Sequence, residues 1–561
     1  PLNRHEINNQ EKKIFMKKII FLTAMTLLSL SGYTQVGIGT TSPHYSSMLD
    51  IVSDTAGFLA PRLTDGQMVA ITYKAIPGLM VYNTTFGHYY VYNGSVWQPA
   101  FGGGNGWLLT GNGNLDPLTD FIGTTDTSKL YFRVYNDKSG IIDWEHRATA
   151  LGYKSLFSNT AYDNTAFGVE PLLLNTTGAQ NVAIGNAALH ENKSGNNNTA
   201  VGFQALYFDT AWNNTAIGES ALHLNTSGNQ NVAIGNNALR QNISGSNSTA
   251  VGYMALYTDT AGNNTAVGSS AAYWNTSGQQ NVAVGNAALN DNRNGHNNTA
   301  VGFLALNHDT AWDNTAVGES AMYANTSGAD NVAVGNSALH DNQTGHNNTA
   351  IGYLAMYFDT AWDNTAVGES AMYENRSGTS NVAFGNSALH DNRTGHNNTA
   401  IGYLALMNDT AWDNTAVGES AMLSNTQGTG NVAVGNSTLV NNHTGNYNTA
   451  LGYLALNQDT VGDNIAIGSW TMYANINGSY NVAVGNSAMA SNSSGNNNTA
   501  IGFEALRNDS ASENTGVGSW AMHENRLGTA NVAMGNGALQ QNQSGSNITA
   551  IGFQALLNNT A

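Results

Sequence analysis

A short phrase recurs through the last three quarters of this chain, and its spacing limits the fold more than any other feature. The phrase NNTAVGFLAL at 297–306 returns as NNTAIGYLAL at 397–406. Counted at the glycine of the phrase, successive copies lie 16, 17 and 17 residues apart, so the cycle closes every 50 residues. This glycine occurs 25 times from Gly152 to Gly552, which predicts one small unit stacked many times.

A single unit, 231–247, is typical of a short strand followed by turns. Val232 and Ile234 would share one face of the strand and Ala233 the other, because side chains alternate. Gly235 would end the strand in a conformation that other residues resist. A second short strand is expected at 238–239, before a turn rich in Asn, Ser and Gly. A helix is the alternative for runs such as ESALHLN, but each is under eight residues and ends at Asn or Gly.

These units predict an all-β fold, a parallel β-solenoid of about 25 coils of 16–17 residues over 148–561, still running where the sequence stops. One coil would bury about two large apolar side chains, each contributing roughly 1.5–3 kcal/mol, while ordering its backbone costs about 1–2 kcal/mol per residue. Coils therefore need neighbours, and the thin core favours a homo-oligomer. The expected structural positions include Gly202, Gly218, Gly235, Ala200, Ala216, Ala233, Leu206, Leu222 and Leu239.

The start of the chain predicts export. Met16 and two lysines precede the apolar run IIFLTAMTLLSL, which is about the length of a signal-peptide core and too short to span a bilayer comfortably. We expect a signal peptide at 16–34, with 1–15 untranslated or extraneous. No other segment is apolar enough to cross a membrane. The predicted location is therefore secreted or at the cell surface.

Two β-rich regions separate this leader from the repeats. The first, 35–105, contains a predicted β-hairpin, with strands at 79–82 and 89–92 around a Thr-Thr-Phe-Gly turn, and ends in the Gly-rich hinge FGGGN. The second, 106–147, is a lead-in with strand-like alternation at 129–134.

Composition excludes several classes of function. The formal charge is −18, and only 10% of residues are charged, which disfavours nucleic acid as a partner. The chain has no Cys, so disulfides, thiolate metal sites and Cys nucleophiles are excluded. No catalytic constellation, phosphate loop or acidic calcium loop is evident, so we expect neither an enzyme nor a metal or cofactor.

The phrase N-[TV]-A-[VI]-G-x-x-A-L, as in NVAVGNSAL at 331–339, resembles the head repeat of trimeric autotransporter adhesins. That resemblance implies a left-handed β-roll in a homotrimer on a Gram-negative outer membrane, attached to matrix proteins, glycans or cells. The repeat here is longer than usual, and no coiled-coil stalk or anchor barrel is evident. The region 35–147 resembles the lead-in of exported tail-fibre-like or adhesin-like proteins.

Tryptophans in the repeated DTAW turn are candidate ligand-binding residues. They stand where other coils carry Gly, so the four would project from a turn in phase, about 14 Å apart along the rod. The alternative is packing between subunits or over the coil edge. The four are Trp212, Trp312, Trp362 and Trp412.

The residue after Asp in the same turn is a candidate O-glycosylation site, since Asp-Thr-Ala resembles the signal of some exported bacterial proteins. The alternative is an ordinary Asp–Thr turn bond. The positions are Thr210, Thr260, Thr310, Thr360, Thr410, Thr460 and Ser510.

Histidines of the GHNN turns, His296, His346 and His396, lie one 50-residue cycle apart, too far apart to share a metal within one chain. Copies from three subunits could meet around a threefold axis, but we interpret these histidines as solvated turn residues. The sequence thus favours a multivalent adhesive rod. A purely structural fibre and, less favoured, an ice- or lattice-binding solenoid remain as alternatives. The lattice-binding alternative rests on a Thr ladder that Val232 and Val282 interrupt.

Overall fold

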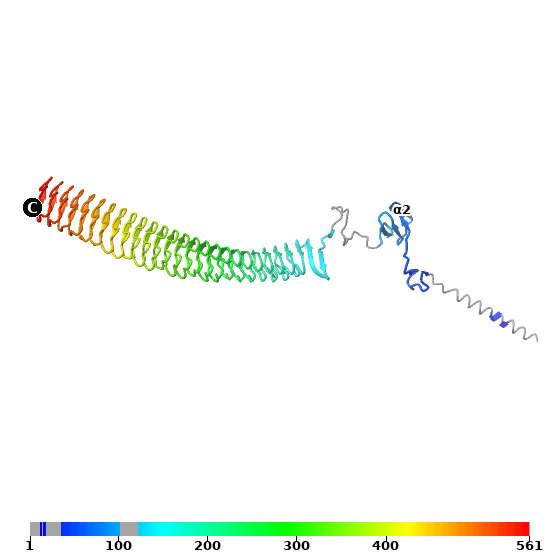
Figure 1. Cartoon of the computed structure of the whole chain (residues 1–561). Coiled ribbons are helices and arrows are strands. Elements are labelled where there is room, and N and C mark those ends of the chain that lie inside the picture. Colours follow the sequence, from blue (N-terminus) through cyan, green and yellow to red (C-terminus); the bar gives the residue numbers. More distant parts are fainter. Residues whose placement is uncertain (1–11, 14, 18–34, 101–121, 560–561) are drawn as a thin grey trace, which may run out of the picture. The chain divides into compact units, whose positions relative to one another are not determined.

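The computed structural model describes residues 12–13, 15–17, 35–100 and 122–559 (Figure 1). The chain divides into two compact units, Pro1–Gly123 and Thr124–Ala561. Most of the expected signal peptide, the Gly-rich hinge and residues 106–121 of the lead-in lie outside the described residues. Within the described part, no helix is long and apolar enough to cross a membrane.

The first unit holds two small sheets. β1 (Val36–Ile38) and β2 (Leu49–Ile51) form a parallel pair. A second sheet has the order β3–β4–β5–β6, and β4 pairs antiparallel with β5, which confirms the predicted hairpin. α2 begins with a capping box in which the Thr64 and Gln67 side chains bond each other's backbone N–H. The elements are β3 (Arg62–Leu63), α2 (Asp65–Ala70), η1 (Thr72–Lys74), β4 (Met80–Asn83), β5 (His88–Tyr92) and β6 (Trp97–Pro99).

The second unit is the solenoid, and its strand ladder starts with an antiparallel edge. β7 (Leu130–Val134) pairs antiparallel with β8 (Asp137–Asp143), and β8 pairs antiparallel with β9. From β9 onward every strand pairs in parallel with the next, one strand per coil. The 25 strands of the ladder confirm the parallel β-solenoid predicted from the glycine spacing.

Its strands are β9 (Ala148–Leu151), β10 (Thr165–Phe167), β11 (Val182–Ile184), β12 (Thr199–Val201), β13 (Thr215–Ile217), β14 (Val232–Ile234), β15 (Thr249–Val251), β16 (Thr265–Val267), β17 (Val282–Val284), β18 (Thr299–Val301), β19 (Thr315–Val317), β20 (Val332–Val334), β21 (Thr349–Ile351), β22 (Thr365–Val367), β23 (Val382–Phe384), β24 (Thr399–Ile401), β25 (Thr415–Val417), β26 (Val432–Val434), β27 (Thr449–Leu451), β28 (Ile465–Ile467), β29 (Val482–Val484), β30 (Thr499–Ile501), β31 (Thr515–Val517), β32 (Val532–Met534) and β33 (Thr549–Ile551).

The core of a coil is narrower than the sequence predicts. In the coil that begins at β14, the buried apolar residues are Ala233, Ala238 and Leu239, while Ile234 is 38% exposed. The expectation of two large buried side chains per coil is wrong here, since only the leucine is large. Alanine faces inward because the opposite wall of the coil is close, and the β-branched residues of each strand therefore face outward.

The predicted second strand is also wrong, because residues 236–241 form turns. Asn237 and Leu239 have φ of 57° and 49°, the left-handed region that costs a non-glycine residue energy. Neighbouring coils hold them there, since the Asn237 N–H donates to the Glu219 carbonyl and the Leu239 N–H to that of Ala255. The turns thus bond to the coils on both sides without being strands.

The repeat glycine behaves as predicted. Gly335 has φ of 142°, and a Cβ there would collide with the carbonyl oxygen of Gly352 in the next coil. Only glycine permits both this conformation and this close approach.

Two ladders of buried side-chain amides connect the coils. In the first, just before each strand, the Asn231 N–H donates to Asn214 Oδ1 at 2.9 Å, and Asn231 Nδ2 donates to the Gly245 carbonyl at 2.8 Å. The second ladder lies on the turn that precedes the first-ladder position of each coil, and there Asn242 Nδ2 donates to Asn225 Oδ1 at 3.2 Å. Such ladders pair most of the buried amides between coils, but Asp interrupts the second ladder at each short coil after the first, and Asn175 Oδ1 and Asn275 Oδ1 have no hydrogen-bond partner.

Candidate binding surface

The four candidate tryptophans lie on the surface of the solenoid. Their exposed fractions are 56% for Trp212, 58% for Trp312, 54% for Trp362 and 55% for Trp412. The main chain beneath them is fixed, since the Trp362 carbonyl accepts the Ser380 N–H of the next coil at 3.2 Å. Each indole therefore projects from a rigid turn with about half of its surface accessible.

The turn histidines, interpreted from sequence as solvated, contact three of these tryptophans. His296 and Trp312 have ring centroids 6.4 Å apart in an edge-to-face arrangement, and the His346–Trp362 pair has the same arrangement at 5.9 Å. In the third pair, His396 and Trp412, the separation is 5.7 Å. Sequence spacing could have revealed this, because each His precedes its Trp by 16 residues, the length of one short coil.

The same histidines are held by the coil before them. The Nδ1 atom of His346 accepts the backbone N–H of Ala329 at 3.0 Å, and Nδ1 of His396 accepts that of Thr379 at 3.0 Å. This bond places the ring proton on Nε2, where it remains a donor.

An amide and a carboxylate complete each group. Asn347 Nδ2 donates to Asp363 Oδ1 at 3.0 Å, in the residues that follow His346 and Trp362. The equivalent distances are 2.9 Å from Asn297 to Asp313 and 3.0 Å from Asn397 to Asp413. We call each set of His, Asn, Trp and Asp a Trp platform. The three platforms are His296, Asn297, Trp312 and Asp313; His346, Asn347, Trp362 and Asp363; and His396, Asn397, Trp412 and Asp413.

Trp212 lacks this setting. Asn196 stands where the platforms have His, and Asn213 where they have Asp. At the next short coil Gly262 replaces the Trp, and a shallow polar hollow lies between Ser246, Thr260 and Gln279. The sequence predicts four equivalent tryptophans, whereas the structure groups three and sets one apart.

The candidate glycosylation residues are exposed at Thr210, Thr260 and Thr310 and half-buried at the other four positions, and the hydroxyl of each makes a hydrogen bond. Thr210 Oγ1 donates to the carbonyl of Thr226 in the next coil at 2.6 Å, and Thr410 Oγ1 donates to that of Thr426 at 2.6 Å. The same bond is made by Thr260, Thr310, Thr360, Thr460 and Ser510. A glycan on the oxygen would remove this donor. Whether these residues are glycosylated stays a prediction.

The Asp before each of these hydroxyls is buried inside the coil. Asp359 Oδ1 accepts the Ala361 N–H at 2.9 Å and Asn375 Nδ2 at 2.9 Å, so this Asp makes a turn bond to the residue after Thr360 and not to Thr360 itself. Burial raises its pKa to about 7 even though these hydrogen bonds act to lower it. Asp209 and Asp309 also have pKa values of about 7, and the Oδ2 atom of each is buried without a hydrogen-bond partner.

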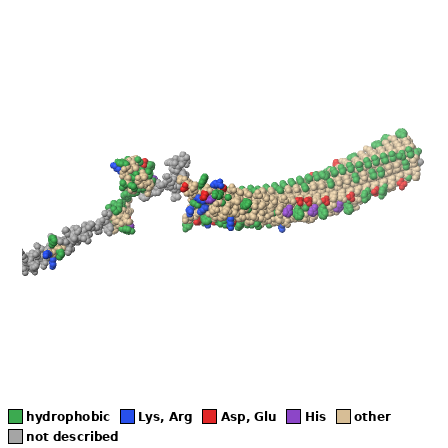
Figure 2. Space-filling view, turned by 180° about the vertical axis from the view of Figure 1, so that it is seen from behind, with side chains coloured by type: hydrophobic (Ala, Val, Ile, Leu, Met, Phe, Trp, Pro, Cys, Tyr) green, Lys and Arg blue, Asp and Glu red, His purple; other side chains and the backbone are tan. Residues whose placement is uncertain are grey.

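The outer face of the strand ladder carries an apolar stripe. We define the outer apolar stripe as the third residue of each strand from β10 to β33. Ile217 is 40% exposed, Val267 39% and Ile401 41%, and parallel pairing puts each in register with the next coil. In Figure 2, rows of hydrophobic side chains follow the length of the solenoid.

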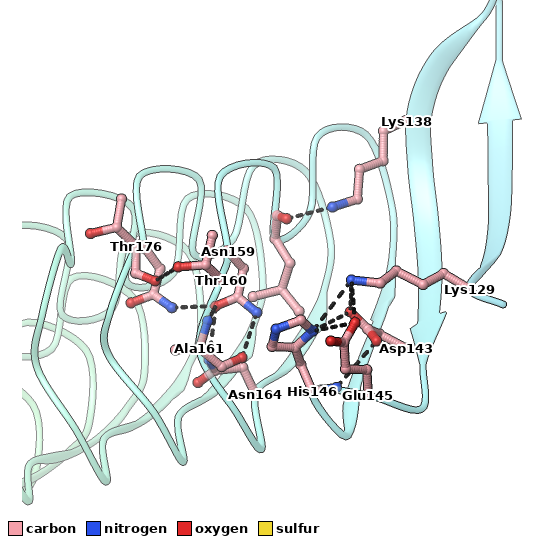
Figure 3. Close-up of polar contacts among 12 residues, drawn as sticks. Lys129, Lys138, Asp143, Glu145, His146, Asn159, Thr160, Ala161, Asn164 and Thr176 are labelled. Atoms are coloured by element: carbon pink, nitrogen blue, oxygen red, sulfur yellow. Dashed lines mark hydrogen bonds and ion pairs between the residues drawn. The ribbon is translucent and has the colours of Figure 1, made fainter. Parts of the chain in front are cut away.

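An acidic cluster at the start of the solenoid has ligand atoms close enough together for a metal. Asp143, Glu145 and His146 offer atoms within 4.8 Å of one another. Figure 3 shows Lys129 directed into the same cluster, with Nζ 2.9 Å from Asp143 Oδ2. Burial acts to raise the pKa of Asp143, but the bonds from Lys129 and His146 outweigh it and leave the pKa below its usual value. The ammonium group occupies the place of a cation, so this cluster is an ion-pair cap on the first coil.

Comparison with known proteins concerns mainly the first unit. The family model of a phage tail-like trimerisation region matches residues 37–113, which include β2–β6, α2 and all of β1 except Val36. No curated protein and no solved structure matches the chain. The match supports a homotrimer and agrees with the tail-fibre-like resemblance of this region. It does not bear on the resemblance to autotransporter heads, so the left hand of the coils and that head type stay predictions.

Proposed function

We propose that this chain is the subunit of an exported trimeric fibre and that the solenoid is its shaft. The observation that carries the proposal is the trimerisation region at 37–113 in the same chain as 25 coils in register. At about 4.8 Å per coil the shaft would be about 120 Å long. Export is inferred from the leader at 16–34, and we place the fibre outside the cell or on its surface.

The outer apolar stripe supports the way in which three shafts would associate. A row of partly exposed Val and Ile side chains along a whole rod is unusual for an isolated soluble chain. Because all copies share one strand spacing, a stripe on one copy stays in register with those of two others. Side-by-side packing would thus enlarge the thin Ala–Leu core with a second apolar layer between chains.

The mass of the whole chain in solution tests this proposal. Light scattering with sedimentation should give three times the 59.1 kDa of one chain and the frictional behaviour of a rod. Removal of 37–113 should lower the fraction of trimer. A monodisperse monomer of the whole chain would refute the fibre.

A pair of variants locates the interface. Val317→Lys with Val334→Lys puts two charges into the stripe and should dissociate or weaken the trimer. Gln343→Lys is the matched control, because Lys193, Arg293 and Arg393 occupy the equivalent turn position in other coils. An unchanged mass for the double variant would place the interface elsewhere.

Adhesion is the second candidate function, and the half-exposed tryptophans are the observation that favours it. Matrix proteins and glycans are the partners implied by the resemblance to adhesins. A structural shaft and an adhesive one are compatible, since a fibre can carry binding groups along its sides.

A further inference from the structure

We propose that the three Trp platforms bind a linear, neutral polysaccharide that lies along the shaft. This deepens the adhesive candidate function by naming its ligand class and rests on that candidate. It does not require the trimer, and the experiments below separate the two.

The platforms have the chemistry that a pyranose ring requires. The face of a sugar ring that carries axial C–H groups stacks on an exposed indole, which offers a large apolar surface with little conformational freedom. Around Trp362, the Nε2–H of His346 can donate to a hydroxyl, and the Asp363 carboxylate can accept from one. A stacking ring between a donor and an acceptor is the usual composition of a small polar-ligand site.

The charge of the platforms selects among glycans. The charged group common to all three is the Asp at 313, 363 or 413, and nearby basic residues are not shared, since Arg293 and Arg393 give way to Gln343 in the second. A carboxylate repels uronic acids and sulfated sugars. The common part of the site therefore favours neutral chains.

The platforms are organised before a ligand arrives. His346 is held by the bond from Ala329 to its Nδ1, and its ring in turn contacts Trp362 edge to face. The bond from Asn347 holds Asp363 through Oδ1, so the carboxylate is oriented as well. Side chains already fixed in place lose little entropy on binding.

The spacing favours a polymer over a single sugar. The platforms follow one another every three coils, about 14 Å by strand spacing, and lie in one row because the strands pair in register. One exposed indole binds weakly, whereas three on a rigid line act together on one chain. Trp212 lies two cycles before the first platform, beyond the open turn at Gly262.

Native gel electrophoresis of the whole chain in gels that contain hydroxyethylcellulose, galactomannan, xylan or dextran tests the proposal. At least one polysaccharide should retard the protein. The triple variant Trp312→Ala, Trp362→Ala and Trp412→Ala should weaken that retardation by about tenfold or more, since stacking residues dominate such sites. Carboxymethylcellulose should retard the protein less than hydroxyethylcellulose does.

Three variants separate binding from structure. The triple variant Phe303→Ala, Tyr353→Ala and Tyr403→Ala removes rings of similar exposure, 50%, 52% and 52%, from the other end of the strands and should leave retardation unchanged. Trp212→Ala should also have little effect. His296→Asn with His346→Asn and His396→Asn should weaken retardation in part, because Asn keeps the backbone bond, as Asn196 does by accepting the Ala179 N–H at 2.7 Å, but removes the imidazole ring.

Three outcomes would overturn the proposal. One is a wild-type protein that none of the four neutral polysaccharides retards. Another is full retardation of the triple Trp variant. The third is a loss of trimer mass in that variant, which would mean that the indoles pack between subunits. If the wild-type protein has the mass of a monomer but a neutral polysaccharide still retards it, the trimeric-fibre proposal is refuted and the glycan-site proposal is supported.

Discussion

The short and long coils of the solenoid share a strand, a glycine and a core of Ala with one larger residue, such as Met356 in the coil of β21 and Met372 in that of β22, but different hydrogen bonds close their turns. In the 17-residue coil of β22, Asn375 Nδ2 donates to the Gly378 carbonyl three residues later, at 2.8 Å. In the 16-residue coil of β21, one turn residue is missing, and Asp359 instead accepts the Ala361 N–H two residues later. Asp accompanies every short coil after the first, which has Asn159.

In the shorter turn the Asp accepts the backbone N–H two residues later, whereas in the longer turn the Asn donates to the Gly carbonyl three residues later; in some long coils, as at Asn392, the Asn also accepts that Gly N–H. Around Asp359, the Ala361 N–H and the Nδ2 atoms of Asn364 and Asn375 all point at one carboxyl group. An amide can also fill this place, because Asn159 accepts the equivalent bond from Asn175 at 2.7 Å and donates to the Ala161 carbonyl at 3.0 Å (Figure 3). The turn therefore does not require a carboxyl group, and the effect of the carboxyl group on the free energy of unfolding depends on pH.

The largest effect should come from the glycine that both coil types share. Gly335→Ala in a long coil and Gly352→Ala in a short one should each destabilise the solenoid by more than about 4 kcal/mol, because the new Cβ meets a backbone oxygen. Denaturant unfolding and hydrogen exchange measure the loss. Gly537→Ser is the control, since Gly537 has φ of 65° where Ser337 has 54°, and a Cβ there would meet no atom closer than 3.3 Å. Unequal losses at the two glycines would show that the coil types differ beyond the turn.

Next in size is the introduction of an Asp into a long coil. Asn375→Asp removes the donor to Gly378 and places a second buried carboxyl beside Asp359, whose Oδ1 now lies 2.9 Å from Asn375 Nδ2. We expect a loss of about 3–5 kcal/mol at pH 8 and a smaller loss at pH 5, where the pair can share protons. Unfolding at the two pH values measures the difference. Equal losses at both would mean that the turn, not the charge, decides.

The reverse change should stabilise the protein at high pH. The pKa of Asp359 is raised to about 7 from an ordinary value near 4, so the folded state binds the proton more tightly than the unfolded chain. The stability that protonated Asp359 contributes is therefore fully present below about pH 4 and is lost as pH rises towards about 7. Asp359→Asn should add on the order of 3 kcal/mol at pH 8 and little at pH 4.

Denaturant unfolding of the Asp359→Asn variant across pH 4–9 measures the gain in free energy of unfolding. Asp363→Asn, on the exposed carboxylate of the same turn, is the control and should leave the pH profile nearly as it is. A gain that is constant with pH would contradict a protonated native carboxyl. The other six buried residues, with pKa values between about 6 and about 8, should add to the same slope: Asp209, Asp259, Asp309, Asp409, Asp459 and Asp509.

The smallest effect should come from the hydroxyl beside the Asp. Thr410→Val removes the bond from Oγ1 to the Thr426 carbonyl but keeps the shape, and should cost about 1 kcal/mol. Thr426→Val in the adjoining long coil removes the equivalent bond to the His443 carbonyl and should cost about the same. A markedly larger loss in the short coil would mean that the hydroxyl also supports Asp409.

The sequence predicts the solenoid well because its main signal is periodic. The glycine spacing places 25 strands, and turn residues place the corners. It predicts the inside of a coil less well, since Ala233 and Ile234 are both apolar and only the narrowness of the coil decides which faces inward. The second strand at 238–239 fails because neighbouring coils hold Leu239 at positive φ, an effect that no local propensity contains.

The candidate binding surface shows the same limit. Trp362 is found by its place in a turn where other coils have Gly. His346 is missed as its neighbour because the two residues lie in different coils. Their adjacency can be predicted only once the length of a coil, here 16 residues, is known. The buried state of Asp359 is missed for a related reason, since an Asp in a turn is normally solvated.

The 50-residue cycle has a consequence for how such a gene can change. Recombination that adds or removes one whole cycle keeps the glycines, the amide ladders, the buried Asp and the aromatic rows in phase, and it alters the rod only by about 14 Å in length. Gain of a single 17-residue coil would instead move every later platform out of phase with those before it. The rod can thus be lengthened or shortened by whole cycles of three coils without a change in any contact between coils.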